Sequence, residues 1–150
     1  MIITLKNETE TTEIGSKLAS YLKGGEVIYL KGELGTGKTT LVRGVLNRLG
    51  HAGNVKSPTY TIVEPYSIDS HVIYHFDLYR LDDPEELESL GIRDYSDGQY
   101  ICFFEWPEKG GNLLPNADIK LELTYLENSL EFELRSKSEV GLTILKKLSK

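Results

Sequence analysis

A glycine-rich run with one lysine and two threonines is the part of the sequence whose residue types and spacing most clearly indicate chemistry. Residues 32–39, GELGTGKT, match the pattern G-x-x-x-x-G-K-[ST] without gaps, and Thr40 follows. Glycines let a backbone curl around a phosphate chain and point its N–H groups at the oxygens. In such a loop Lys38 reaches the β and γ phosphates of a nucleoside triphosphate, and the Thr39 hydroxyl binds Mg²⁺. The nucleotide-binding residues expected here are Glu33, Gly35, Thr36, Gly37, Lys38, Thr39 and Thr40.

The residues on either side of this loop have the pattern that phosphate binding requires. Residues 27–30 are apolar and rich in β-formers, which predicts a buried strand. Residues 38–49 place apolar side chains on one helical face, and Gly50 is a typical helix stop. The positive end of that helix would add to the attraction for phosphate. The alternative is a glycine-rich turn that matches the pattern by chance, and the predicted strand and helix on either side favour the phosphate loop over it.

Two carboxylates end apolar runs further along the chain. Asp77 closes residues 72–77, and Glu105 closes residues 101–105. A triphosphate site needs a carboxylate near its metal, commonly at the end of a neighbouring strand, and Asp77 fits that position. Glu105 could orient the attacking water or bind Mg²⁺ through one. The sequence alone leaves open that Asp77 lies in a solvated loop and that Glu105 is an ordinary surface residue.

Residues 57–60, Ser57-Pro58-Thr59-Tyr60, lie between the loop's helix and the next extended segment. A hydroxyl in this region can respond to the γ-phosphate and its magnesium. On sequence alone, a turn with Pro58 at its corner is the better interpretation. Arg43 and Arg80 are the nearby candidates for an arginine finger, but surface ion pairs explain both more simply.

The remaining pattern predicts an α/β fold in one domain, residues 1–150. Strands are predicted at residues 2–5, 60–66, 72–79, 100–104, 119–125 and 130–134, and further helices at 9–23, 82–90 and 140–148. The helix at 9–23 has Thr9, Thr11 and Thr12 as possible caps, and His75 is expected to be a hydrogen-bonded core residue. The fold class is therefore P-loop NTPase-like, with a mostly parallel central sheet flanked by helices and a C-terminal antiparallel hairpin.

Composition excludes several classes of function. Lys and Arg total 17 against 23 Asp and Glu, a net charge of −6, so the chain should not hold nucleic acid tightly by itself. Cys102 is the only cysteine, which rules out an internal disulfide and fits a reducing cytoplasm. No apolar run approaches the roughly 20 residues that span a bilayer, so no membrane association is expected.

Four segments together resemble the bacterial TsaE family, the small P-loop ATPases of tRNA threonylcarbamoyladenosine biosynthesis. They are residues 32–40 (GELGTGKTT), 56–60 (KSPTY), 75–81 (HFDLYRL) and 104–108 (FEWPE). They occur in the family's order and spacing. The resemblance covers essentially the whole chain and is weakest after Asp118.

The resemblance implies a core that binds ATP with Mg²⁺, in which Thr39, Asp77 and Glu105 serve the metal and hydrolysis, with Lys38 on the phosphates. It implies that residues 57–60 are switch-like and that the turn around Glu8 and Thr11 lies near the adenine. It also implies docking on the TsaB–TsaD pair. TsaD would transfer the threonylcarbamoyl group to adenosine 37 of tRNA, and this chain would meet tRNA only through that complex.

The expected function is thus a slow, Mg²⁺-dependent ATPase that supports tRNA modification without performing the transfer. Two alternatives stay open. One is a small-molecule kinase on the same core, although 150 residues leave little room for a substrate lid. The other is a nucleotide-gated binding module in which hydrolysis is incidental.

Overall fold

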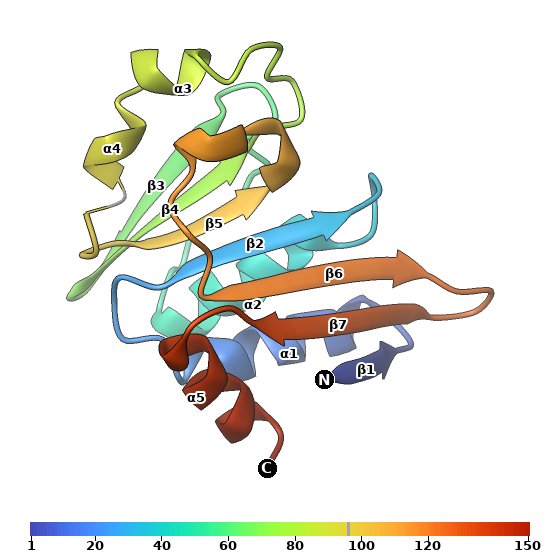
Figure 1. The fold of residues 1–150 in the computed structure, drawn as a ribbon. Coiled ribbons are helices and arrows are strands. Elements are labelled where there is room, and N and C mark those ends of the chain that lie inside the picture. Colours follow the sequence, from blue (N-terminus) through green and yellow to red (C-terminus); the bar gives the residue numbers. More distant parts are fainter. Residues whose placement is uncertain (96) are drawn as a thin grey trace.

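Strand β2 (Val27–Gly32) lies in the middle of a seven-stranded sheet in the computed structural model of the chain, which describes residues 1–95 and 97–150 (Figure 1). The strand order is β1-β7-β6-β2-β5-β4-β3. The other strands are β1 (Ile2–Leu5), β3 (Val63–Ile68), β4 (His71–Asp77), β5 (Ile101–Glu105), β6 (Ile119–Tyr125) and β7 (Leu130–Ser136). The helices are α1 (Glu8–Ala19), α2 (Lys38–Leu49), α3 (Glu86–Ser89), α4 (Ile92–Tyr95) and α5 (Glu139–Leu148), with 3₁₀ turns η1 (Pro107–Lys109) and η2 (Gly111–Leu113).

The sheet is mostly parallel. Strand β2 pairs in parallel with β5 and β6, and β4 pairs in parallel with β5. Only β3 and β7 run against this direction, because β1 is antiparallel to β7 and therefore parallel to β6. The central strands are covered on both faces, which explains their continuous apolar runs. The predicted α/β class, parallel centre and C-terminal hairpin β6–β7 are confirmed.

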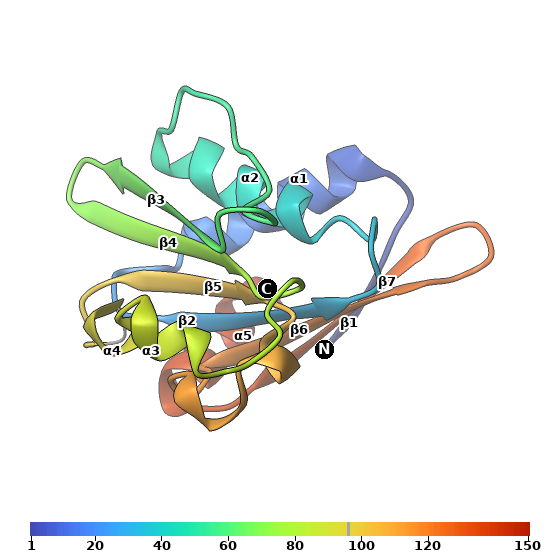
Figure 2. The ribbon, with the colours of Figure 1, turned by 90° about the horizontal axis from the view of Figure 1, so that it is seen from above.

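Helices cover the two faces of the sheet with separate hydrophobic cores. Figure 2 shows α1 and α2 on one side of the sheet and α3 and α4 on the other. The first core joins side chains of α1, α2 and α5 to the sheet, including Leu18, Leu41, Phe103 and Ile144. The second core packs α3, α4 and the segment after η2 on β4 and β5, around the stacked rings of Phe76 and Phe104. Within the described residues, no helix is long and apolar enough to cross a membrane.

Helix α1 begins and ends earlier than predicted. Its cap is Asn7, whose Oδ1 accepts the backbone N–H of Glu10 at 2.9 Å, and not one of the threonines. The helix ends at Ala19 because the next amides bond three residues back, as in Tyr21 N to Leu18 O, which tightens the chain into turns. The predicted end at residue 23 is therefore wrong.

Two other segments differ from their predicted bounds. The extended segment expected at 60–66 begins only at Val63, because a turn precedes it in which Ile62 N donates to Pro58 O. Strand β3 is an edge strand, as the presence of Pro65 indicates. The helix expected at 82–90 forms only over α3, residues 86–89, and it ends before Gly91, which has a φ of +75°. The short helix α4 that follows Gly91 was not predicted.

Helices α1 and α2 touch through two glycines. A Cβ at Gly44 would lie 2.4 Å from the carbonyl oxygen of Thr12, and a Cβ at Gly15 would lie 2.4 Å from that of Leu41. Backbone therefore meets backbone where the helices cross. This contact fixes the position of α1 relative to α2, the helix that follows the glycine-rich loop.

We predict that Gly44→Ala destabilises the protein although alanine is the better helix former. The new methyl group would strike the α1 backbone, and overpacking of this kind costs about 1–3 kcal/mol, against a gain in helix propensity of about 1 kcal/mol. The free energy of unfolding in urea measures the difference. Asn47→Ala, at an exposed position of the same helix, is the control. A Gly44→Ala protein at least as stable as the wild type would contradict the close contact.

Candidate nucleotide-binding site

The glycine-rich loop, residues 32–39, connects the carboxyl end of β2 to the first turn of α2. Gly37 caps α2 with a φ of +100°, a conformation that residues with a side chain rarely adopt. At Gly32 a Cβ would lie 2.8 Å from both Leu123 O and Thr36 Oγ1, so the backbone has no room for a side chain there. The predicted strand–loop–helix arrangement is confirmed.

Lys38 is a buried cation inside the loop. Its Nζ donates to the carbonyl of Gly32 and, at 3.4 Å, to that of Glu33. The ammonium lies 4.2 Å from the centre of the Trp106 ring. Burial lowers the pKa of Lys38, while the nearby carboxylates of Glu105 and Asp77 raise it. The contact between Lys38 and the Trp106 ring was not predicted from the sequence.

Glu105 lies directly beside the start of α2. The Thr39 hydroxyl donates to Glu105 Oε2 at 3.0 Å, and His75 Nε2 lies 2.5 Å from the same oxygen. The side chains of Glu105 and His75 are 4% and 0% exposed. Glu105 is therefore not a surface residue, and the expectation of a hydrogen-bonded core histidine is confirmed. That these two residues bind each other was not predicted.

Asp77 is buried and ties residues 57–62 to the end of β4. Its Oδ2 accepts the hydroxyls of Thr59 at 3.0 Å and Ser57 at 3.4 Å, and its Oδ1 accepts the backbone N–H of Tyr79 at 2.9 Å. Its own N–H donates to Ile62 O at 2.8 Å. The carboxylate is not in a solvated loop. Asp77 thus connects residues 57–59 to the end of β4, the strand that pairs with the strand of Glu105.

The other two residues of the switch-like segment do not join this cluster. Pro58 is buried, and its carbonyl accepts Ile62 N at 2.7 Å. Tyr60 is 81% exposed, and its ring carries the Arg80 guanidinium at 4.2 Å. Arg43 forms the expected ion pair, with Glu8 at 3.3 Å. Arg80 contacts an aromatic ring in place of an expected acid.

A cavity of about 230 Å³ brings these groups together, with Lys38, Thr39, Ser57, Thr59, Asp77, Glu105 and Trp106 in its wall. The groups in its wall that could bind a metal are hydroxyl and carboxylate oxygens, and Mg²⁺ prefers oxygen ligands. In the part of the chain that the structure describes, no three His, Cys, Asp or Glu side chains gather closely enough to hold a metal alone. The donor set therefore fits Mg²⁺, which is commonly held by one or two carboxylates together with substrate phosphates and water.

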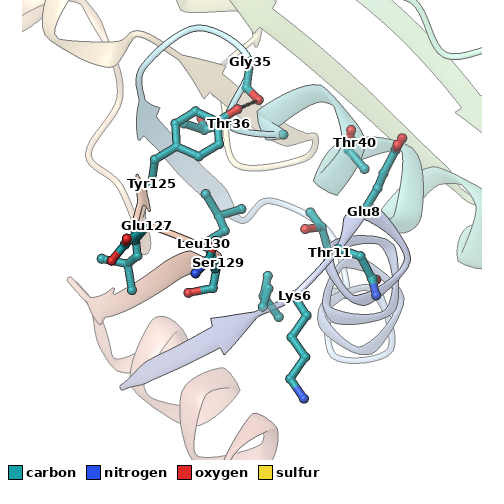
Figure 3. Close-up of a pocket in the computed structure, with 15 residues that line it drawn as sticks. Lys6, Glu8, Thr11, Gly35, Thr36, Thr40, Tyr125, Glu127, Ser129 and Leu130 are labelled. Carbon is teal, nitrogen blue, oxygen red and sulfur yellow. Dashed lines mark hydrogen bonds between the residues drawn. The ribbon is translucent and has the colours of Figure 1, made fainter.

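A second cavity, of about 450 Å³, adjoins the loop on the side of α1 (Figure 3). Glu8 and Thr11 line it together with Gly35, Thr36, Gly37 and Thr40. Figure 3 shows Tyr125 facing this space from the tip of the β6–β7 hairpin, and its hydroxyl donates to Gly35 O. The hairpin tip, residues 125–130, was not predicted to reach the site, because only the pairing of β6 with β2 brings it there.

Comparisons with known proteins agree on one family. The model of the family described as "Threonylcarbamoyl adenosine biosynthesis protein TsaE" matches residues 5–134. A Haemophilus influenzae protein named tRNA threonylcarbamoyladenosine biosynthesis protein TsaE is 47% identical over 97% of this chain and 95% of its own length. A Bacillus subtilis protein of the same name is 38% identical over 77% of this chain and 72% of its own. A crystal structure of Bacillus subtilis YdiB aligns with a TM-score of 0.86 and 27% identity, covering 99% of this chain and 93% of that one.

We predict that Asp77→Ala loosens residues 57–61. The substitution removes the acceptor of two side-chain hydroxyls, so local opening of this segment becomes more favourable. Hydrogen–deuterium exchange followed by mass spectrometry should show faster exchange in the peptide that covers residues 57–61. Asp82→Ala removes an exposed carboxylate and serves as the control. If this peptide exchanges at the same rate in Asp77→Ala and in the wild type, the hydrogen bonds to Asp77 do not hold the segment in place.

Proposed function

The chain belongs to the TsaE family of threonylcarbamoyl adenosine biosynthesis proteins, and on this premise we propose that it is a Mg²⁺-dependent ATPase whose hydrolysis sustains tRNA threonylcarbamoylation. The observation that carries the proposal is the 3.0 Å bond between Thr39 Oγ1 and Glu105 at the end of the glycine-rich loop. A loop for phosphates, a hydroxyl for the metal and a buried carboxylate thus meet at one point. Asp77 stands next to Glu105 in the parallel pair of strands.

Each residue of the site has a role in this proposal. The loop N–H groups and the α2 N-terminus bind the phosphate chain. Lys38 exchanges its bonds to the Gly32 and Glu33 carbonyls for bonds to the β and γ phosphates. Thr39 and Asp77 would hold Mg²⁺, and the bound ion would supply positive charge beside the phosphates. Glu105 accepts a hydrogen bond from the attacking water and orients it toward the γ-phosphorus.

The larger cavity is the proposed site for the nucleoside part of ATP. It is continuous with the loop through Gly35, Thr36 and Gly37, and its opposite wall carries Glu8 and Thr11. Tyr125 is 58% exposed at its edge, so an aromatic ring is available beside a bound base.

Hydrolysis by the isolated chain should be slow. The two arginines near the site are engaged with Glu8 and with the Tyr60 ring, and an arginine finger can raise the rate about 10³–10⁵-fold.

We propose that the chain acts on the TsaB–TsaD complex in forming N6-threonylcarbamoyladenosine at position 37 of tRNA. The transfer chemistry would belong to TsaD. The net charge of −6 supports an indirect contact with tRNA.

We predict that Lys38→Ala weakens ATP binding by roughly 100-fold or more, since two charge-assisted hydrogen bonds of about 1.5–3 kcal/mol each are lost. Isothermal titration calorimetry with ATP and Mg²⁺ measures the affinity. Lys31→Ala is the matched control, because Lys31 is an exposed lysine on β2, one residue before the loop. Similar losses for both variants would point to general charge attraction, and an unchanged affinity in Lys38→Ala would remove the site assignment.

The function is tested by repeated-turnover threonylcarbamoylation of tRNA with TsaB, TsaD and ATP, with and without this protein. We expect sustained product formation with the wild type and a halt after the first turnover without it or with Lys38→Ala. If a folded, ATP-binding wild type does not sustain turnover, the proposal fails. Transfer of ³²P from ATP to a small metabolite would then favour the kinase alternative.

A further inference from the structure

We propose that His75 is a positioning residue that sets the orientation of the Glu105 carboxylate, an inference that rests on the proposed function. His75 lies on β4 and Glu105 on the neighbouring strand β5, and His75 Nε2 is 2.5 Å from Glu105 Oε2. The imidazole is fully buried. It contacts Glu105 but lines neither of the two cavities described above.

The buried imidazole of His75 has one polar contact that explains why a histidine occupies this position. Nδ1 is buried, and among the described residues it has no hydrogen-bond partner. A buried polar atom without a partner costs free energy. An apolar side chain of similar size has no polar atom to leave without a partner and would avoid that cost. The bond from Nε2 to Glu105 is therefore the contribution that a histidine makes here and an apolar residue could not.

One carboxylate oxygen of Glu105, Oε2, accepts hydrogen bonds from both Thr39 and His75. Thr39 Oγ1 donates to Oε2 from α2, and His75 Nε2 meets Oε2 from β4. Two donors from different elements leave the carboxylate little freedom to rotate, and neither bond uses Oε1. A glutamate that orients water must hold its free oxygen in a fixed direction, because small errors of position reduce the rate strongly. His75 supplies the part of that restraint that comes from the sheet.

Substitutions at position 75 separate this role from packing. Glutamine can place its amide nitrogen near the position of Nε2, whereas the amide nitrogen of asparagine corresponds to Nδ1 and falls short. We expect His75→Leu and His75→Asn to lower kcat for ATP hydrolysis about 10- to 100-fold, the usual loss when a residue that orients an active-site ligand is removed. The affinity for ATP should not change. His75→Gln should recover most of kcat.

His71→Leu is the matched control, because His71 lies on the same strand and lines neither cavity. A thermal melt of each variant shows whether it is folded. A purely structural role would make asparagine and glutamine equivalent, or would let leucine restore activity. Equal kcat in wild type, His75→Leu and His75→Asn would overturn the proposal, as would an equal loss in His75→Asn and His75→Gln.

The bond itself has a readout that does not need activity. In ¹H–¹⁵N spectra of the imidazole groups, the Nε2 proton of His75 should appear far downfield and move upfield in Glu105→Ala. The chain has three histidines, and the loss of the signal in His75→Gln assigns it. If the wild type does not hydrolyse ATP, the proposed function fails while the spectrum still tests the bond. If hydrolysis proceeds and no such signal exists, only the role of His75 fails.

Discussion

The parallel pairing of β2, β5 and β4 is the constraint on which the site depends. Parallel strands end at the same edge of a sheet, so the glycine-rich loop, Glu105 and Asp77 meet although long stretches of sequence separate them. Their register pairs Asp77 with Glu105, which puts both carboxylates on the same face. A slip of one residue would turn either of them to the opposite face.

The same face of the sheet is apolar along the strands and polar only at its end. Ile73 and Phe103 pack in the core beneath α1 and α2, and His75, Asp77 and Glu105 continue that face toward the start of α2. Carboxylates at the border of a core need partners, and hydrogen bonds from Thr39, Thr59 and His75 supply them. The close contact at Gly15 and Gly44 fixes α1 against α2. Residues of α1 and of the glycine-rich loop can therefore line the larger cavity together.

Local patterns were sufficient to predict the strand–loop–helix unit, the β6–β7 hairpin and the two carboxylates at strand ends, because each depends on residues close in sequence. The bond between His75 and Glu105 depends on strand register, which the sequence does not state. Tyr125 reaches the loop only through the pairing of β6 with β2. Asn7 was missed as the cap of α1 because three threonines close to it were equally suitable caps.

The central claim is that this site hydrolyses ATP to sustain tRNA modification, and Glu105→Ala tests it most directly. The measurement is phosphate released and tRNA modified, both over many turnovers, with TsaB and TsaD present and ATP binding determined in parallel. The account predicts retained ATP binding, phosphate release reduced to near background and modification that stops after the first turnover. Sustained modification by a variant that binds ATP without releasing phosphate would contradict it and would favour a nucleotide-gated binding module.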